Sequence, residues 1–242
     1  MTEPLRQNRW IDLVPGCAGY LALPPAGRGP GLVLLQEIFG VNEHIRAVAE
    51  QYALDGFVVL APDLFWRQAP RVQLGYVGPD WERALSLMQA YTAEQAVADL
   101  GVAVQALRAR TEVCTAEGAA ARVGALGYCM GGRMAWFAAA TAGVDAAVAY
   151  YGGGIHANLE RVATVRCPLQ FHYAGHDEHI PPGAVASVRE TVQKALGPAR
   201  AEVHVYEPAH HGFNCWARAS YHAPSAALAH GRSLEFLARH LF

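Results

Sequence analysis

Short apolar runs alternate with longer stretches of helical periodicity along most of the 242 residues. Residues 31–35 (GLVLL) and 57–61 (FVVLA) contain no polar side chain, which is typical of strands buried on both faces of a parallel sheet. Between such runs, apolar positions recur with the period of an amphipathic helix. The alternation predicts an α/β fold with a mostly parallel sheet and helices on both faces.

Two runs near the N-terminus, residues 9–14 and 20–23, are joined through Pro15-Gly16 and predict an antiparallel hairpin. Further strands are expected at residues 31–35, 57–61, 123–127, 146–151, 169–174 and 202–206. Helices are expected at residues 41–54, 81–91, 93–110, 131–142, 184–195 and 225–240. Since no repeat or linker interrupts this order, we expect one domain over residues 1–242. The irregular segment 64–80 is long enough to indicate a lid or binding loop.

Composition narrows the possible functions. Hydrophobic residues make up 52% of the chain, charged residues 17%, and the net charge is −2 with scattered Lys and Arg. This balance gives no indication of binding to nucleic acid or to a membrane surface. Residues 1–6 are polar and lead into no apolar segment, so no signal peptide is expected, and no apolar run approaches the ~18 residues of a membrane span. We therefore expect a cytoplasmic protein.

The five cysteines are an odd number without a C-x-x-C pair, which favours reduced thiols over a disulfide framework or a zinc site. Cys17, Cys114 and Cys167 are interpreted as packing residues. Cys129 differs because it lies in Gly-Tyr-Cys-Met-Gly-Gly at residues 127–132, directly after an apolar run. The pattern G-x-C-x-G is the thiol version of the G-x-S-x-G turn that carries the nucleophile of α/β-hydrolases. The alternative is a buried cysteine beside helix-packing glycines.

A thiol nucleophile needs a base, and the base needs a group that orients it. In α/β-hydrolases the acid and then the histidine follow the nucleophile, each after a strand. Asp177 follows the run 169–174 and His211 follows the run 202–206, so both occur in that order. Taken singly, Asp177 could be a capping carboxylate and His211 a surface residue paired with His210; the joint order favours a triad.

Further candidate side chains lie near this site. His172, His176, Asp177 and His179 could be metal ligands, but they lack helical i, i+4 spacing and a cysteine partner, so we expect neither metal nor cofactor. Glu37 follows the strand 31–35, in the loop that supplies an oxyanion-hole N–H in α/β-hydrolases. A carboxylate in this loop would repel the negatively charged oxygen of an oxyanion. Glu37 could instead be an acidic residue at a helix N-terminus.

The chain resembles the dienelactone hydrolase (carboxymethylenebutenolidase) family over nearly its whole length. The motifs that carry the resemblance are QEIFGVN at 36–42, PDL at 62–64 with RQAP at 67–70, GYCMGG at 127–132, YYG at 150–152, and the Asp177 and His211 loops. The resemblance implies an α/β-hydrolase whose Cys-His-Asp triad opens the lactone of a dienelactone to a maleylacetate-type product, in bacterial degradation of aromatic compounds.

The resemblance also implies roles for neighbouring residues. Glu37 would pair with the resting Cys129, help to take its proton when substrate binds, and then swing away. The backbone N–H groups of Ile38 and Met130 would bind the oxyanion. Phe39 and Tyr151, which lie in the matching motifs, are candidate substrate contacts.

The arginines that hold the substrate carboxylate in well-known members of the family are missing at their usual positions. One follows the triad histidine by four residues, where this chain has Cys215, and the other aligns with Trp81. Arg83 and Arg218 are the nearest replacements in the sequence.

A small-molecule ester or lactone is the expected partner, and a monomer or small homo-oligomer is the expected state. One alternative is a carboxylesterase or thioesterase of the same family with a less anionic substrate. Another, of a different class, is a non-catalytic redox-sensing thiol protein built on Cys129.

Overall fold

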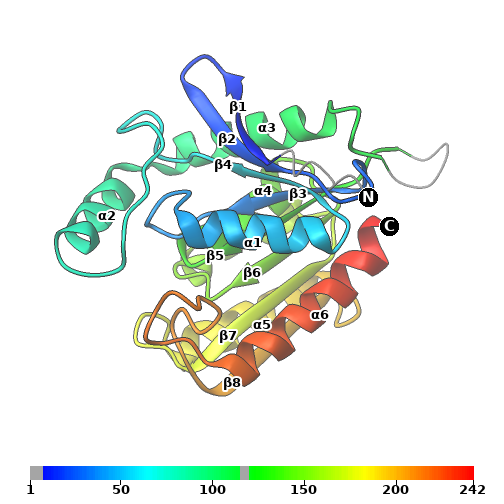
Figure 1. Ribbon diagram of the computed structural model, residues 1–242. Coiled ribbons are helices and arrows are strands. Elements are labelled where there is room, and N and C mark those ends of the chain that lie inside the picture. The colour runs from blue at the N-terminus through cyan, green and yellow to red at the C-terminus, as the bar shows by residue number, and fades with distance from the viewer. Residues whose placement is uncertain (1–7, 115–119) are drawn as a thin grey trace.

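The computed structural model describes residues 8–114 and 120–242; residues 1–7, on which the expected absence of a signal peptide depends, lie outside this part. An eight-stranded sheet with the order β1-β2-β4-β3-β5-β6-β7-β8 forms its centre (Figure 1). The strands are β1 (Arg9–Val14), β2 (Cys17–Ala22), β3 (Gly31–Leu35), β4 (Val58–Pro62), β5 (Val123–Tyr128), β6 (Ala146–Tyr150), β7 (Leu169–His176) and β8 (Ala201–His210). Strands β1, β2 and β4 pair antiparallel and the other pairs are parallel, which confirms the predicted sheet and hairpin.

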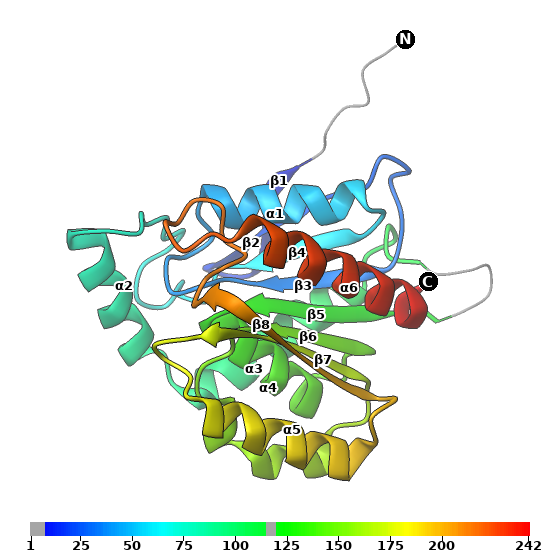
Figure 2. The ribbon, with the colours of Figure 1, turned by 90° about the horizontal axis from the view of Figure 1, so that it is seen from below.

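Helices cover both faces of the sheet (Figure 2). They are α1 (Glu43–Leu54), α2 (Pro79–Ala90), α3 (Ala93–Arg108), α4 (Met130–Thr141), α5 (Pro182–Leu196) and α6 (Ala223–Leu241). Helices α1 and α6 lie on one face and α3, α4 and α5 on the other, whereas α2 stands beyond the carboxyl ends of the parallel strands (Figure 2). Within residues 8–114 and 120–242, no helix has the length and apolar character to cross a membrane.

The last two strands extend further than their apolar runs predict. Strand β7 continues to His176 and β8 to His210, with an irregularity in their pairing between Ala174 and His176. Both extensions contain polar side chains, so the hydrophobic pattern ends before the backbone pairing does. They carry the chain directly to Asp177 and His211. Two short 3₁₀-helices, Ile155–Ala157 and Leu159–Thr164, were not expected from the sequence.

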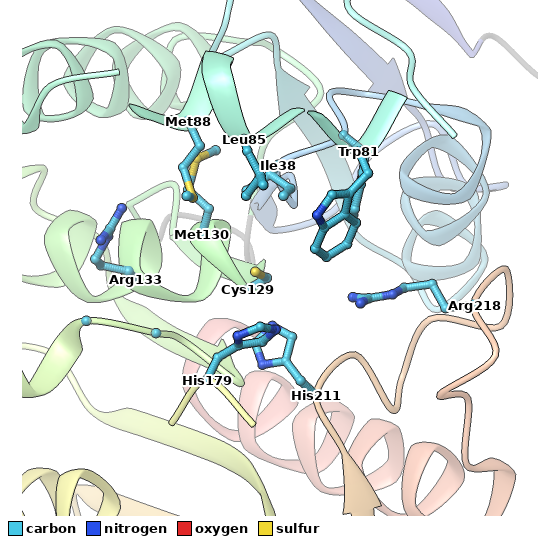
Figure 3. A pocket seen from close by; sticks show the side chains of 13 residues that line it. Ile38, Trp81, Leu85, Met88, Cys129, Met130, Arg133, His179, His211 and Arg218 are labelled. Atoms are coloured by element: carbon cyan, nitrogen blue, oxygen red, sulfur yellow. The ribbon is translucent and has the colours of Figure 1, made fainter. Parts of the chain in front are cut away.

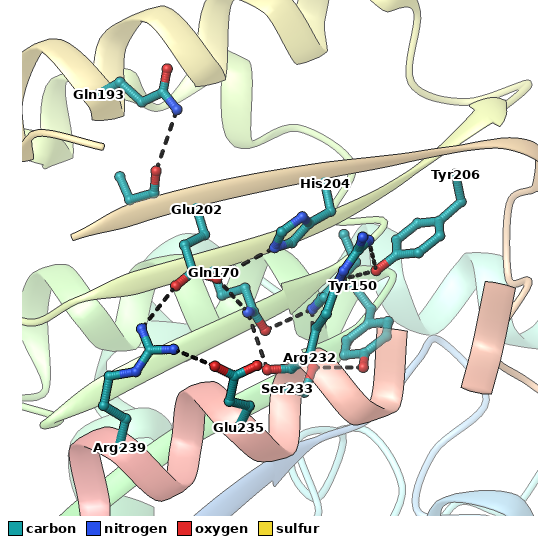
Figure 4. Close-up of polar contacts among 12 residues, drawn as sticks. Tyr150, Gln170, Gln193, Glu202, His204, Tyr206, Arg232, Ser233, Glu235 and Arg239 are labelled. Carbon is teal, nitrogen blue, oxygen red and sulfur yellow. Dashed lines mark hydrogen bonds and ion pairs between the residues drawn. The ribbon is translucent and has the colours of Figure 1, made fainter. Parts of the chain in front are cut away.

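A buried polar network ties α6 to the sheet (Figure 4). His172 on β7 contacts the Tyr206 hydroxyl through Nδ1 at 2.8 Å, and its Nε2 lies 2.8 Å from Gln170 Oε1 and 3.0 Å from Ser233 Oγ on α6. Ser233 in turn meets the Tyr150 hydroxyl at 2.7 Å. Burial holds the pKa of His172 well below its usual 6.5, so the ring is neutral and both of its nitrogens are occupied by the network.

The junction of β5 and α4 is packed backbone to backbone. A Cβ on Gly127 would lie 2.0 Å from the Gly131 carbonyl oxygen, and a Cβ on Gly131 would lie 2.1 Å from the Leu35 carbonyl oxygen. Backbone atoms cannot move aside as a flexible side chain can. Glycine at these positions therefore sets how closely α4 approaches β3 and β5.

This close approach can be tested with a pair of glycine substitutions. Gly127→Ala is expected to destabilise the protein by about 3 kcal/mol, because the added methyl group forces the junction apart. Gly101→Ala on α3 is the control: no atom lies within 4 Å of its added Cβ, so a gain of up to about 1 kcal/mol is expected from helix propensity. Urea unfolding measures both, and equal effects would contradict the tight junction.

Candidate active site

Cys129 occupies a strained turn between β5 and α4. Its backbone has φ 55° and ψ −115°, in a region that residues with a side chain rarely adopt. The turn is held by hydrogen bonds from the Cys129 N–H to the Tyr150 carbonyl (3.0 Å) and from the Gly132 N–H to the Cys129 carbonyl (3.0 Å). The thiol is placed at the N-terminus of α4, where the free N–H groups favour negative charge.

His211 and Asp177 form a buried pair beside this thiol. His211 Nδ1 lies 2.8 Å from Asp177 Oδ2, and the two side chains are 6% and 1% exposed. Asp177 Oδ1 also accepts the backbone N–H groups of His179 (2.8 Å) and Ile180 (3.0 Å), which fixes the carboxylate. Because Nδ1 faces Asp177, the Nε2 side of the ring is left for Cys129, whose interaction with His211 raises the pKa of the ring.

Opposing effects act on the charge of His211. Burial alone would lower its pKa, but the hydrogen bond to Asp177 and the interaction with Cys129 outweigh burial and raise the pKa to about 10. The imidazole therefore holds its proton at neutral pH. A positive ring beside the sulfur is the electrostatic partner that a thiolate requires.

Tyr151, expected to contact substrate, instead supports the histidine. Its side chain is fully buried, and its ring meets the His211 ring edge-on with centroids 5.0 Å apart. Its N–H donates to the His172 carbonyl at 2.7 Å, which draws the residue into the sheet. Tyr151 thus lies behind the imidazole and is not among the residues that line the cavity.

Glu37 is paired with Arg218 in this structure. Arg218 Nη1 lies 3.3 Å from Glu37 Oε1, and the side chains are 14% and 1% exposed. Burial raises the pKa of Glu37, and the Arg218 charge acts in the opposite direction. The resemblance led us to expect a contact between Glu37 and the resting thiol; here the full charge of Arg218 is the stronger partner for a buried carboxylate.

A tight turn brings Arg218 to Glu37 although it lies seven residues after His211. Gly212 has φ +79°, and a Cβ there would lie 2.4 Å from Arg218 Nη1, so the chain folds back over this glycine. The guanidinium carbon is then 5.9 Å from the ring centroid of Phe39 and 6.0 Å from those of Tyr76 and Trp81, within the range of cation–π attraction. Of the two candidate replacement arginines, Arg218 therefore reaches the site.

A cavity of about 280 Å³ opens over Cys129 (Figure 3). It is lined by Ile38, Phe39, Trp81, Leu85, Met88, Cys129, Met130, Arg133, Gly153, Gly154, His179, His211 and Arg218. Trp81, Leu85 and Met88 form one face of α2 at i, i+4 and i+7. Arg83 lies between these positions on the helix, is exposed, and does not line the cavity.

Several lining residues were missed from the sequence. The α2 face could have been predicted, because apolar residues with helical spacing directly follow the irregular segment 64–80. Arg133 could also have been predicted, because it is the only charged residue in the helix sequence MGGRMAWFAAAT. Gly153 and Gly154 could not, because the path of the loops brings them to the cavity, and His179 was considered only as a metal ligand.

Ile38 and Met130 flank Cys129 in the cavity wall. Met130 is the first residue of α4, so its N–H has no acceptor within the helix and is available to a ligand. Across the described ranges 8–114 and 120–242, no three His, Cys, Asp or Glu side chains gather closely enough to hold a metal ion. His172, one of the ligands considered, belongs to the network beneath α6.

The elevated pKa of His211 yields a test. Asp177→Asn should lower that pKa toward or below 6.5, because the carboxylate that stabilises the imidazolium is lost; titration of the ¹⁵N-labelled ring by NMR measures it. Since the folded-state pKa is the higher one, the pairing stabilises the fold fully below pH 6.5, and this contribution disappears as the pH rises through about 10. Glu178→Gln, which removes the exposed partner of His210, is the control and should leave the pKa of His211 unchanged.

The pair Glu37–Arg218 predicts a pH-dependent loss of stability. Arg218→Gln leaves Glu37 buried without its counter-charge and should cost about 3 kcal/mol at pH 8. The loss should be smaller at pH 5, since the raised pKa of Glu37 lets the folded state bind a proton there. Urea unfolding at both pH values measures this, with Arg239→Gln in an exposed ion pair as a control. Equal losses at both pH values would contradict the argument.

Comparisons with known proteins identify the family of the chain. The model of the dienelactone hydrolase family matches residues 17–241. A carboxymethylenebutenolidase from Pseudomonas putida is 37% identical over 220 residues, which cover 89% of this chain and 88% of the relative. Carboxymethylenebutenolidase 1 from Cupriavidus pinatubonensis is 32% identical and covers 90% of both chains. The crystal structure of a dienelactone hydrolase from Anabaena variabilis shares the fold, with a TM-score of 0.68, 19% identity and coverage of 98% of this chain and 99% of its own. The chain belongs to the dienelactone hydrolase family and is a hydrolase of ester or lactone bonds.

Proposed function

We propose that the protein opens the lactone of a dienelactone-type substrate through a thioester on Cys129. The observation that carries this proposal is that Cys129, in the strained turn at the start of α4, shares the cavity wall with His211, which is hydrogen-bonded to Asp177. A buried carboxylate, an imidazole and a partly exposed nucleophile are the parts that acyl transfer needs. Degradation of aromatic compounds and a cytoplasmic location belong to the same proposal and rest on the resemblance of motifs.

In the first half of the reaction, Cys129 Sγ attacks the lactone carbonyl carbon. The carbonyl oxygen becomes negative and is held by the N–H groups of Ile38 and Met130. The ring C–O bond then breaks, and the enol oxygen takes a proton from His211. Because the leaving oxygen is part of the same molecule, the ring-opened chain stays attached to the sulfur as a thioester.

In the second half, water attacks the thioester carbonyl while His211 accepts its proton. The C–S bond breaks, the carboxylic acid departs, and the sulfur and imidazole return to their starting state. Asp177 keeps Nδ1 of the ring occupied throughout, so that Nε2 faces the reacting atoms. Glu37, in contact with Arg218, balances the charge of that arginine beside the cavity.

Cys129→Ala should abolish turnover of a dienelactone and of a p-nitrophenyl ester while leaving the unfolding midpoint close to that of the parent. Mass spectrometry of the acid-quenched parent enzyme should find one acyl group, on the peptide that contains Cys129. Cys215→Ala is a matched control, since burial and the nearby Glu37 raise the pKa of that thiol to about 12. Acylation of Cys129 should be the same in the Cys215→Ala variant as in the parent enzyme.

Full activity of Cys129→Ala would contradict the proposal. Reversible oxidation of Cys129 to a sulfenic acid, without turnover of any ester, would favour the redox-sensing alternative.

A further inference from the structure

Arg133 is a charged side chain in an otherwise apolar helix. It lies in the first turn of α4, four residues after Cys129, and its side chain lines the cavity. Its neighbours Met134, Ala135, Trp136 and Phe137 are all buried. A guanidinium keeps its charge in such surroundings, so the helix brings a positive charge to the cavity wall beside the thiol.

This charge has no partner within the described part of the chain. Among residues 8–114 and 120–242, no side-chain hydrogen bond or ion pair of Arg133 is found, and its Nε is shielded from solvent without an acceptor. Burial lowers the pKa of Arg133, and the charge of Cys129 acts in the opposite direction. A partly buried cation without a counter-charge is costly, and an anion bound next to it would offset that cost.

The cavity contains no acidic side chain to serve as this counter-charge. None of its 13 lining residues is Asp or Glu. Arg218 is already neutralised by Glu37, and His211 by Asp177. Arg133 is therefore the arginine of the cavity wall that is available to an incoming anion.

The position of Arg133 differs from that of Arg218. Figure 3 shows the two arginines on opposite sides of Cys129. Arg133 lies against Gly154, where a Cβ would be 3.0 Å from Nη1 and where φ is +83°. The glycine lets the backbone of the 3₁₀ segment approach the guanidinium closely and thereby fixes its place.

We propose that Arg133 binds a carboxylate group of the substrate and thereby selects carboxylate-bearing lactones and esters over neutral ones. This deepens the proposed function and rests on it. The carboxylate lies on the α4 side of the sulfur, away from Glu37, and accepts hydrogen bonds from the guanidinium while the reacting carbonyl lies over Cys129. Arg133 supplies the charge recognition on the α4 side of the cavity, whereas Trp81 lies on the other side of Cys129, near Arg218, and contributes an aromatic surface.

The test compares two esters of similar size, p-nitrophenyl hydrogen succinate and p-nitrophenyl butyrate. In Arg133→Met, the ratio of kcat/KM for the anionic ester to that for the neutral ester should fall about tenfold to hundredfold, mainly through a higher KM. Arg133→Lys should retain part of the preference as a point charge. Arg28→Met removes an exposed arginine before β3, at the opposite edge of the sheet, and should leave the ratio unchanged.

A binding measurement covers the case in which turnover itself is weak. Calorimetry with succinate should give an affinity about tenfold or more lower for Cys129→Ala/Arg133→Met than for Cys129→Ala. Unfolding curves confirm that the variants are folded.

An unchanged ratio, an equal loss on both esters, or equal succinate affinities would overturn the role of Arg133. Failure of the proposed function gives a different result: no acyl group on Cys129 and no turnover of either ester by the parent enzyme.

Discussion

The geometry of the site depends on the close contact between α4 and the strands β3 and β5. Gly127 and Gly131 bring backbone atoms together where any side chain would collide, and α4 can start only as near to the sheet as they permit. That closeness forces Cys129 into a conformation with φ 55°. The strained turn points the thiol outward and puts the Met130 N–H next to it. Strain at one residue is offset by the packing of a buried helix whose remaining side chains are mostly apolar.

The charged side chains around the cavity are of two kinds: those paired with a side chain of opposite charge, and Arg133, which has no such partner in the described part of the chain. Asp177 and Glu37 are each almost fully buried and each holds one cation, His211 and Arg218 respectively. These pairs lie in surroundings of low polarity, where an unmatched charge has a stronger effect than it has in water. The unpaired guanidinium of Arg133 consequently makes the cavity locally positive, although the net charge of the whole chain is −2.

The sheet, its helices and the grouping of Cys129, His211 and Asp177 were predictable because each depends on a local pattern. Apolar runs marked the buried strands. Cys129, Asp177 and His211 each follow one of these strands, and the parallel topology brings the ends of these strands to the same edge of the sheet. The arginines were harder to predict, because their positions depend on helical phase and loop path. Arg83 is two residues from Trp81 and therefore faces solvent. Arg218 reaches Glu37 only because the chain turns back over Gly212, and sequence distance from His211 does not reveal that turn.

The position of Arg218 has a consequence for Glu37. If a substrate carboxylate were to bind Arg218, it would compete with Glu37 for the same guanidinium and release a buried negative charge beside the thiol. A carboxylate at Arg133 avoids this competition, because that arginine lies on the other side of Cys129 (Figure 3). The ion pair between Glu37 and Arg218 then persists when substrate is bound. In the proposed arrangement, charge recognition and charge compensation are assigned to different arginines, so each can be altered without removing the other.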